Sequence, residues 1–111
     1  MSKRSDHDFL SDIREALQRI EEYSHGLTYE QFISDLKTQD AVVRNLEIIG
    51  EAAKNVSDTF RRQHPNIAWS ELAKLRDKLI HHYFGVNFDI VWDVISEYLP
   101  EIKNQIKKIL N

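Results

Sequence analysis

One stretch in the second half of the chain concentrates side chains that can move protons and bind anions. It spans Leu72–Trp92 and reads LAKLRDKLIHHYFGVNFDIVW. An imidazole, with an ordinary pKa near ~6.5, can act as acid or base at neutral pH, and a guanidinium presents a permanent charge on a planar fork that suits phosphate oxygens. These groups are compatible with acid–base chemistry at a phosphate ester. The side chains concerned are Lys74, Arg76, Lys78, His81, His82 and Tyr83.

Part of this stretch has the spacing of a known motif. Arg76, His81 and Tyr83 stand in the order R-x4-H-x-Y. The R-x4-H core alone is a weak signal, but three flanking segments accompany it at matching spacings. With them the sequence resembles the HepT-like toxins of the HEPN superfamily over nearly the whole chain. The flanking segments are NLEIIGEAAK at Asn45–Lys54, PNIAW at Pro65–Trp69 and VWDVISEYLP at Val91–Pro100.

The resemblance implies a helical bundle that forms a homodimer and acts as the toxin of a toxin–antitoxin pair. It implies a metal-independent endoribonuclease site around the motif arginine and histidine, here Arg76 and His81. It also implies a partner, a minimal nucleotidyltransferase antitoxin, which in some systems adenylylates the motif tyrosine, here Tyr83. No metal ion and no other cofactor is expected.

The chemistry of the residues agrees with that implication. Cleaving RNA without a metal requires a base for the 2′-OH proton, an acid for the leaving oxygen and positive charge beside the transition state. We assign the acid–base role to His81 and the phosphate role to Arg76. Attack by the 2′-OH would leave a 2′,3′-cyclic phosphate.

Helix geometry suggests that one chain alone is not enough. At about 100° per residue, positions five apart differ by about 140°, so Arg76 and His81 do not share a helix face. Arg76 would instead lie within roughly 40° of four other residues of the same helix, Trp69, Leu72, Ile80 and Tyr83. We therefore expect a two-fold dimer to gather Arg76 and His81 of both chains around one groove.

Four further residues have a possible role at the site and a plain alternative. Asp77, four residues before the motif histidine, could orient its imidazole. Glu51 is either a solvated residue or a partner of the motif arginine, because a buried unpaired carboxylate is unfavourable. His82 could assist the motif histidine, but we expect it to face solvent. Tyr83 is either a site of modification or an ordinary packed aromatic residue.

The spacing of apolar residues predicts helices throughout the chain. A first helix, capped by Ser5, should run to about Tyr23 and end at His25-Gly26. Thr28 and Gln31 have the spacing of a capping box and predict a second, short helix. This short helix should carry Phe32, Ile33 and Leu36.

The longest helix should begin with Thr38 as its cap and carry an apolar stripe from Val42 to Phe60. Pro65 ends it, because the residue before a proline is disfavoured in a helix. Another helix should run from near Ser70 to Phe84.

Gly85 should cap that helix, and Asn87 should cap the last helical segment, which Pro100 must kink or restart. The four main helices and their short connections predict an all-α, antiparallel up-and-down four-helix bundle with a short extra helix. The whole chain, residues 1–111, should form one domain.

Composition narrows the class of protein. A net charge of −3 argues against non-specific coating of nucleic acid, so any RNA-binding surface must be a local basic patch. The absence of cysteine excludes disulfides and thiolate-ligated metal sites. No apolar run approaches the ~20 residues of a membrane helix, and the N-terminus does not read as a signal peptide. We expect a cytoplasmic protein.

Two hypotheses remain open on the sequence alone. The first is an endoribonuclease toxin, which the set of Arg76, His81 and Tyr83 favours. The second is a non-catalytic helical dimer that binds, or is modified by, a nucleotidyltransferase, which the acidic net charge favours mildly.

Overall fold

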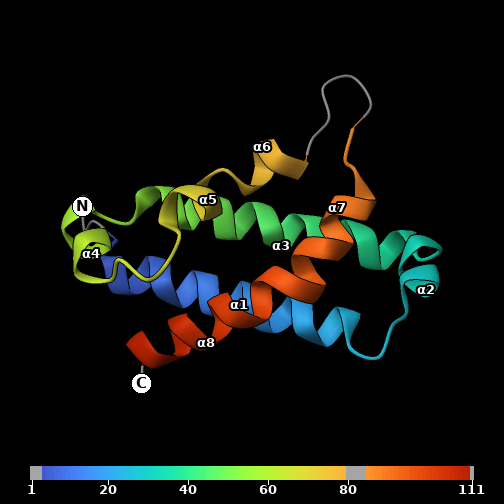
Figure 1. The fold of residues 1–111 in the computed structure, drawn as a ribbon, viewed down its shortest axis with the longest axis horizontal. Coiled ribbons are helices and arrows are strands. Elements are labelled where there is room, and N and C mark those ends of the chain that lie inside the picture. Colours follow the sequence, from blue (N-terminus) through green and yellow to red (C-terminus); the bar gives the residue numbers. More distant parts are fainter. Residues whose placement is uncertain (1–3, 80–84, 111) are drawn as a thin grey trace.

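The fold is all-α in the computed structural model, which describes residues 4–79 and 85–110 (Figure 1). No strand is present in these two ranges, and the fold class predicted from the sequence is confirmed. The elements are α1 (Asp6–Ser24), α2 (Tyr29–Ile33), α3 (Leu36–Asn55), α4 (Asp58–Gln63), α5 (Trp69–Ala73), α6 (Leu75–Leu79), α7 (Phe88–Asp93), the π-helical turn η2 (Val94–Tyr98) and α8 (Leu99–Leu110).

Two long helices, α1 and α3, form the scaffold and pack side by side (Figure 1). They run antiparallel: Asp6 at the start of α1 accepts hydrogen bonds from the backbone N–H (2.8 Å) and hydroxyl (2.7 Å) of Ser57, just beyond the end of α3. The core between them is built from fully buried aliphatic side chains, because each helix turns one apolar stripe inward. These include Leu10, Ile13, Val42, Leu46 and Ile49.

The other helices cover this pair from two sides. The α5–α6 segment packs on α3, while α8 packs on α1, so that the two segments lie on opposite sides in Figure 1. Short α2 contacts α7 at one end of the bundle. Within the described residues, no helix is long and apolar enough to cross a membrane.

Several helix starts lie where the sequence predicted them. Ser5 caps α1, accepting from the N–H of Asp8 at 3.1 Å, while the Asp8 carboxylate accepts from the N–H of Ser5. Thr28 and Gln31 form the expected capping box of α2. Asn87 caps α7, accepting from two backbone N–H groups. These predictions are confirmed because a short polar side chain satisfies N–H groups that a helix start leaves unpaired.

The predicted limits of the longest helix are wrong at both ends. Its cap is Asp35, which accepts from the N–H of Thr38 at 3.0 Å, so Leu36 belongs to α3 and not to the short helix before it. The helix stops at Asn55, since the next backbone is extended and Ser57 caps a separate helix, α4. Phe60 lies in α4, although it still packs against the core.

The helix predicted from near Ser70 to Phe84 is also broken. It forms α5 and α6, with Lys74 between them at φ −98° and ψ 9°. The predicted extension to Phe84 lies outside the described residues. Gly85 has φ 78°, the left-handed conformation expected of a capping glycine, but the helix end that it was predicted to cap lies outside the described residues.

The prediction that Pro100 kinks or restarts the last helical segment corresponds to a change of helix type, because the α-helical pattern resumes in α8 at Leu99, one residue before Pro100. The turn before it, η2, is a π-helix, and α7, η2 and α8 follow one another without a gap (Figure 1). Proline has no N–H to donate and its ring crowds the preceding turn, so a wider turn lets the helix continue past it.

Candidate active site

The segment that carries Arg76 rests on α3 at a glycine. A Cβ built at Gly50 would lie 3.4 Å from the carbonyl oxygen of Leu72 and 3.7 Å from that of Ala73. The backbone of the α5–α6 corner therefore packs closely on α3 at this position, where a Cβ would just make van der Waals contact and a larger side chain would clash. Leu72 and Leu75 are buried on either side of the corner. Together these contacts fix where α6 starts and which way it points.

Arg76 projects from α6 toward solvent. Its side chain is 67% exposed, and its Nε lies 3.8 Å from Oε2 of Glu47 on α3. The predicted alignment of Arg76 with Trp69 and Leu72 is wrong, because both of those residues are buried whereas Arg76 is exposed. The other two residues of that alignment, Ile80 and Tyr83, lie outside the described residues. That projection assumed one continuous helix, whereas the break at Lys74 turns α6 relative to α5.

The supporting carboxylates lie elsewhere than expected. Glu51 is exposed and is not among the residues within 4.0 Å of the Arg76 side-chain nitrogens; Glu47 is. The Glu51 side chain lies instead 3.5 Å from the amide nitrogen of Asn55. Asp77 is exposed on α6. The imidazole that Asp77 was predicted to orient lies outside the described residues.

The structure leaves three predicted site residues, His81, His82 and Tyr83, outside the described residues. It does describe the chain on both sides of them. The backbone N–H of Asn87 donates to the carbonyl of Leu79 at 2.9 Å, so the end of α6 and the start of the next segment are held together. Of the two predicted catalytic residues, Arg76 lies within the described residues and His81 lies outside them.

A charged hollow of about 410 Å³ lies on the α5–α6 segment. Lys78 extends over the ring of Tyr98, with its Nζ 6.0 Å from the ring centre. Burial raises the pKa of Tyr98 to about 12, and the negative charge of nearby Glu71 adds to the rise. Lys78 thus links the hollow to η2 through the partly buried ring of Tyr98. Its lining residues are Glu71, Lys74, Asp77 and Lys78.

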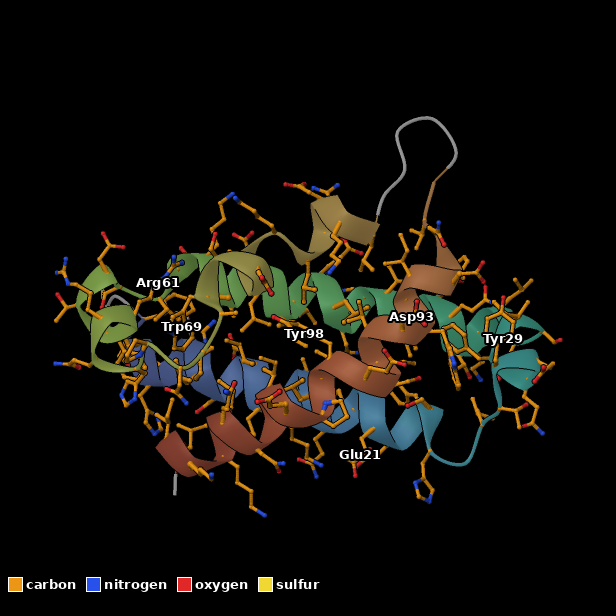
Figure 2. The ribbon with its side chains drawn as sticks, viewed as in Figure 1. Glu21, Tyr29, Arg61, Trp69, Asp93 and Tyr98 are labelled. Carbon is orange, nitrogen blue, oxygen red and sulfur yellow. The ribbon has the colours of Figure 1, made fainter. Side chains whose placement is uncertain are left out.

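An aromatic cluster anchors α7, the helix that follows the motif. The ring of Phe32 on α2 lies 5.4 Å from that of Trp92 and 6.4 Å from that of Phe88. Tyr29 packs edge-on against Trp92 at 6.1 Å and donates its hydroxyl to Asp89, a hydrogen bond that raises the pKa of Tyr29. Figure 2 shows Tyr29 at the end of the molecule opposite Trp69.

Sequence reasoning missed two residues of this region, Gly50 and Glu47. They lie three positions apart on α3, and both meet the α5–α6 segment. A signal for Gly50 was present: a glycine inside a helix costs about 1 kcal/mol relative to alanine, so it usually has a packing reason. No sequence feature distinguished Glu47 from Glu51. Within the described residues, no group of three His, Asp or Glu side chains is arranged to hold a metal ion.

Comparison with known proteins gives a consistent picture. A family model described as ribonuclease HepT-like matches residues 13–109. A protein of Thermococcus cleftensis named "probable ribonuclease HepT" is 50% identical over 107 residues, which cover 96% of this chain and 97% of that protein. A relative in Methanocaldococcus jannaschii, named as a candidate RNase, is 43% identical over 110 residues, covering 99% of this chain and 91% of its own length.

A third relative, from Caldanaerobacter subterraneus and also named as a candidate RNase, is 44% identical over 102 residues, 92% of this chain and 91% of its own. No solved structure matches the chain. The family match covers most of the helical bundle, including α6 and the R-x4-H-x-Y motif. The chain therefore belongs to the ribonuclease HepT-like family of the HEPN superfamily.

Proposed function

We propose that this protein is a metal-independent endoribonuclease and the toxin of a toxin–antitoxin pair, with Arg76 and His81 as its catalytic residues. One observation supports the proposal most directly. Arg76 stands in the family motif on a short helix that is fixed against α3, yet its side chain is 67% exposed and open to a ligand. Names of relatives that refer to RNase activity give independent support.

The proposed reaction is a transesterification. The 2′-oxygen attacks the adjacent phosphorus and the bond from phosphorus to the 5′-oxygen breaks. One imidazole accepts the 2′-OH proton and an imidazolium donates a proton to the leaving 5′-oxygen. The products are a 2′,3′-cyclic phosphate and a 5′-hydroxyl. Arg76 binds the non-bridging oxygens, whose negative charge grows in the transition state.

We further propose that the active form is a homodimer. Two copies of the α6 end around one groove would supply two imidazoles from His81, one as base and one as acid. The same symmetry would place two Arg76 guanidinium groups beside the phosphate. A stable monomer with full nuclease activity would contradict this part of the proposal.

The proposed regulator is a nucleotidyltransferase antitoxin that adenylylates Tyr83. The transfer would join the Tyr83 oxygen to the α-phosphorus of a nucleoside triphosphate and release pyrophosphate. The added phosphate is an anion two positions from His81 in the sequence. It would compete with RNA for the positive charge of Arg76, which would explain neutralisation without unfolding.

The test is RNA cleavage by purified, unmodified protein in excess EDTA. Cleavage with cyclic-phosphate ends is expected, with a fall on the order of 10²-fold or more in Arg76→Ala and His81→Ala, because each removes a group that acts in the transition state. Arg19→Ala is the matched control, since Arg19 is another exposed, ion-paired arginine, 49% exposed on α1. All variants should be checked for folding and dimerisation.

The second candidate function is a non-catalytic dimer that binds or is modified by the nucleotidyltransferase. The net charge of −3 favours it, because RNA binding then depends on a small basic area. No cleavage of several structured and unstructured RNAs, by protein verified free of adenylylation, would overturn the nuclease and support this second function.

A further inference from the structure

The face of α3 beneath the α5–α6 segment both packs against that segment and pairs with its arginine. At Gly50 the backbone of the corner packs closely on α3, because a Cβ there would lie 3.4 Å from the carbonyl oxygen of Leu72, with no room for a larger side chain. One turn earlier, Glu47 reaches Arg76, with Oε2 at 3.8 Å from Nε. The same helix face therefore sets the position of α6 and faces its arginine with a carboxylate.

The contact between Glu47 and Arg76 leaves the terminal nitrogens of the guanidinium free to bind a phosphate. A guanidinium carries one N–H on Nε and four on the two terminal nitrogens. The atom of Arg76 nearest to Glu47 is Nε, at the inner side of the group, and the side chain as a whole stays 67% exposed. The terminal nitrogens, which form the fork that suits phosphate oxygens, can therefore point outward.

The carboxylate of Glu47 also opposes the binding of RNA. Its negative charge lies beside the site where an RNA phosphate would bind and repels that phosphate through solvent. An exposed ion pair also adds little to folding stability. Glu47 is 39% exposed, and its 3.8 Å distance from Arg76 exceeds the length of a hydrogen bond. The contact therefore improves neither the affinity for RNA nor the folding stability of the protein. Orientation of a long, otherwise free side chain is the effect that remains.

We propose that Glu47 is a positioning residue that holds the Arg76 guanidinium with its terminal nitrogens outward for the scissile phosphate. This inference rests on the proposed nuclease and adds to it a residue on a different helix. An arginine on a short exposed helix samples many rotamers, and fixing it before the substrate arrives raises the turnover rate rather than the affinity.

Kinetics separate this role from a structural one. In Glu47→Gln, kcat for RNA cleavage should fall about tenfold, because misplacing a catalytic group slows the chemical step. KM should stay the same or fall, since one negative charge near the phosphate is lost. The substitution should have no further effect in the Arg76→Ala background. A fall in melting temperature with unchanged kcat, or an equal loss in the Arg76→Ala background, would overturn the inference.

The matched control is Glu21→Gln. Like Glu47, Glu21 forms an ion pair with a basic residue of another helix. Its partner is Lys103, so this pair joins α1 to α8 and lies away from α6 (Figure 2). Removing its charge changes the net charge of the protein by the same amount. It should leave kcat unchanged, so a general effect of charge on RNA cleavage would appear in both variants and would count against a specific role of Glu47.

A measurement on Arg76 that does not depend on RNA cleavage separates the positioning role of Glu47 from the proposed nuclease activity. The motion of the Arg76 side chain, followed by nitrogen-15 relaxation of its Nε–H resonance (assigned by its loss in Arg76→Lys), should be restricted in the natural protein and larger in Glu47→Gln. Unchanged motion would overturn the positioning of Arg76, even in an active nuclease. Motion that increases, in a protein that cleaves no RNA, would overturn the nuclease while the contact between Glu47 and Arg76 stands.

Discussion

The α1–α3 pair and the α5–α6 segment are built in opposite ways. α1 and α3 contain 19 and 20 residues, and each turns a continuous stripe of buried aliphatic side chains toward its neighbour. α5 and α6 contain five residues each, with Lys74 between them and exposed charges on their outer surface. Helices of five residues are unstable alone, so this segment owes its shape to the surface on which it packs.

The difference assigns separate tasks to the two regions. The long pair buries more hydrophobic residues than any other pair of helices among the described residues, and burial of apolar side chains is the main source of folding stability. The short segment presents Arg76 and the charged hollow, and what holds it is local: Leu72, Leu75 and the approach over Gly50. Substitutions in the first region should therefore unfold the protein, and those in the second should alter the site.

The largest expected effect comes from the long pair. Leu46, fully buried on α3, should when changed to alanine lower the free energy of unfolding by about 2–5 kcal/mol, because the change removes buried apolar area and leaves a cavity. Urea denaturation followed by circular dichroism measures this.

Leu75→Ala on α6 is the comparison variant for that experiment, since Leu75 is buried to 1% exposure. Native-state hydrogen exchange should show α6 opening locally in Leu75→Ala while the α3 amides keep their protection. Simultaneous loss of protection in α3 and α6 would mean that the two regions form one cooperative unit and do not differ in stability.

The second-largest effect is expected at Gly50, where α3 contacts the α5–α6 segment. Gly50→Val should destabilise by about 1–3 kcal/mol, because its methyl groups would be forced into the backbone of the α5–α6 corner. Gly50→Ala should be nearly neutral, since its Cβ meets the carbonyl of Leu72 at 3.4 Å while alanine favours the helix.

RNA cleavage by the two Gly50 variants then reports on α6. Gly50→Val should lose activity beyond what its unfolded fraction explains, because α6 and Arg76 are displaced. Gly50→Ala serves as its control and should keep near-natural kcat. Equal activity per folded molecule in both variants would show that the corner can shift without disturbing the site.

Much of the scaffold could be predicted from the sequence. Ser5, Thr28, Gln31 and Asn87 act through local hydrogen bonds, and local spacing reveals these. The predicted helix ends were wrong where two neighbouring sequence features favoured different helix boundaries. Asp35 and Thr38 are both good caps, and Ser57 interrupts an apolar stripe that periodicity alone extends to Phe60.

The site could be predicted only in part. Arg76 was found through its motif, but its partner was not, because Glu47 and Glu51 are both polar residues on α3. Which of them faces α6 depends on the break at Lys74 and on the approach over Gly50. Both are properties of tertiary packing, which a one-dimensional pattern does not contain.

A smaller effect is expected at the start of α7. Asn87→Ala removes the side chain that accepts from the N–H groups of Asp89 and Ile90, and should lower the free energy of unfolding by about 1 kcal/mol. Asn87→Asp retains an acceptor and should recover most of the loss. Thermal denaturation of the three proteins checks this; equal losses in both variants would show that the cap contributes nothing.

The smallest effect at neutral pH is expected where the short segment meets η2. The hydroxyl of Tyr98 is buried and has no hydrogen-bond partner within the described residues, so Tyr98→Phe should change stability by less than about 0.5 kcal/mol at pH 7. At alkaline pH the two proteins should differ. The pKa of Tyr98 rises from its ordinary value of 10.0 to about 12 in the folded protein, chiefly through burial.

The sign follows from which state releases the proton first. The unfolded chain loses the Tyr98 proton near pH 10 and the folded chain near pH 12, so ionisation favours unfolding between these values. The natural protein should therefore lose stability over this range more steeply than Tyr98→Phe. Absorbance titration of tyrosinate should show a step near pH 12 that the variant lacks. A titration of Tyr98 near pH 10 would mean that solvent reaches its hydroxyl, and that the joint between α6 and η2 is as open as the surface that carries Arg76.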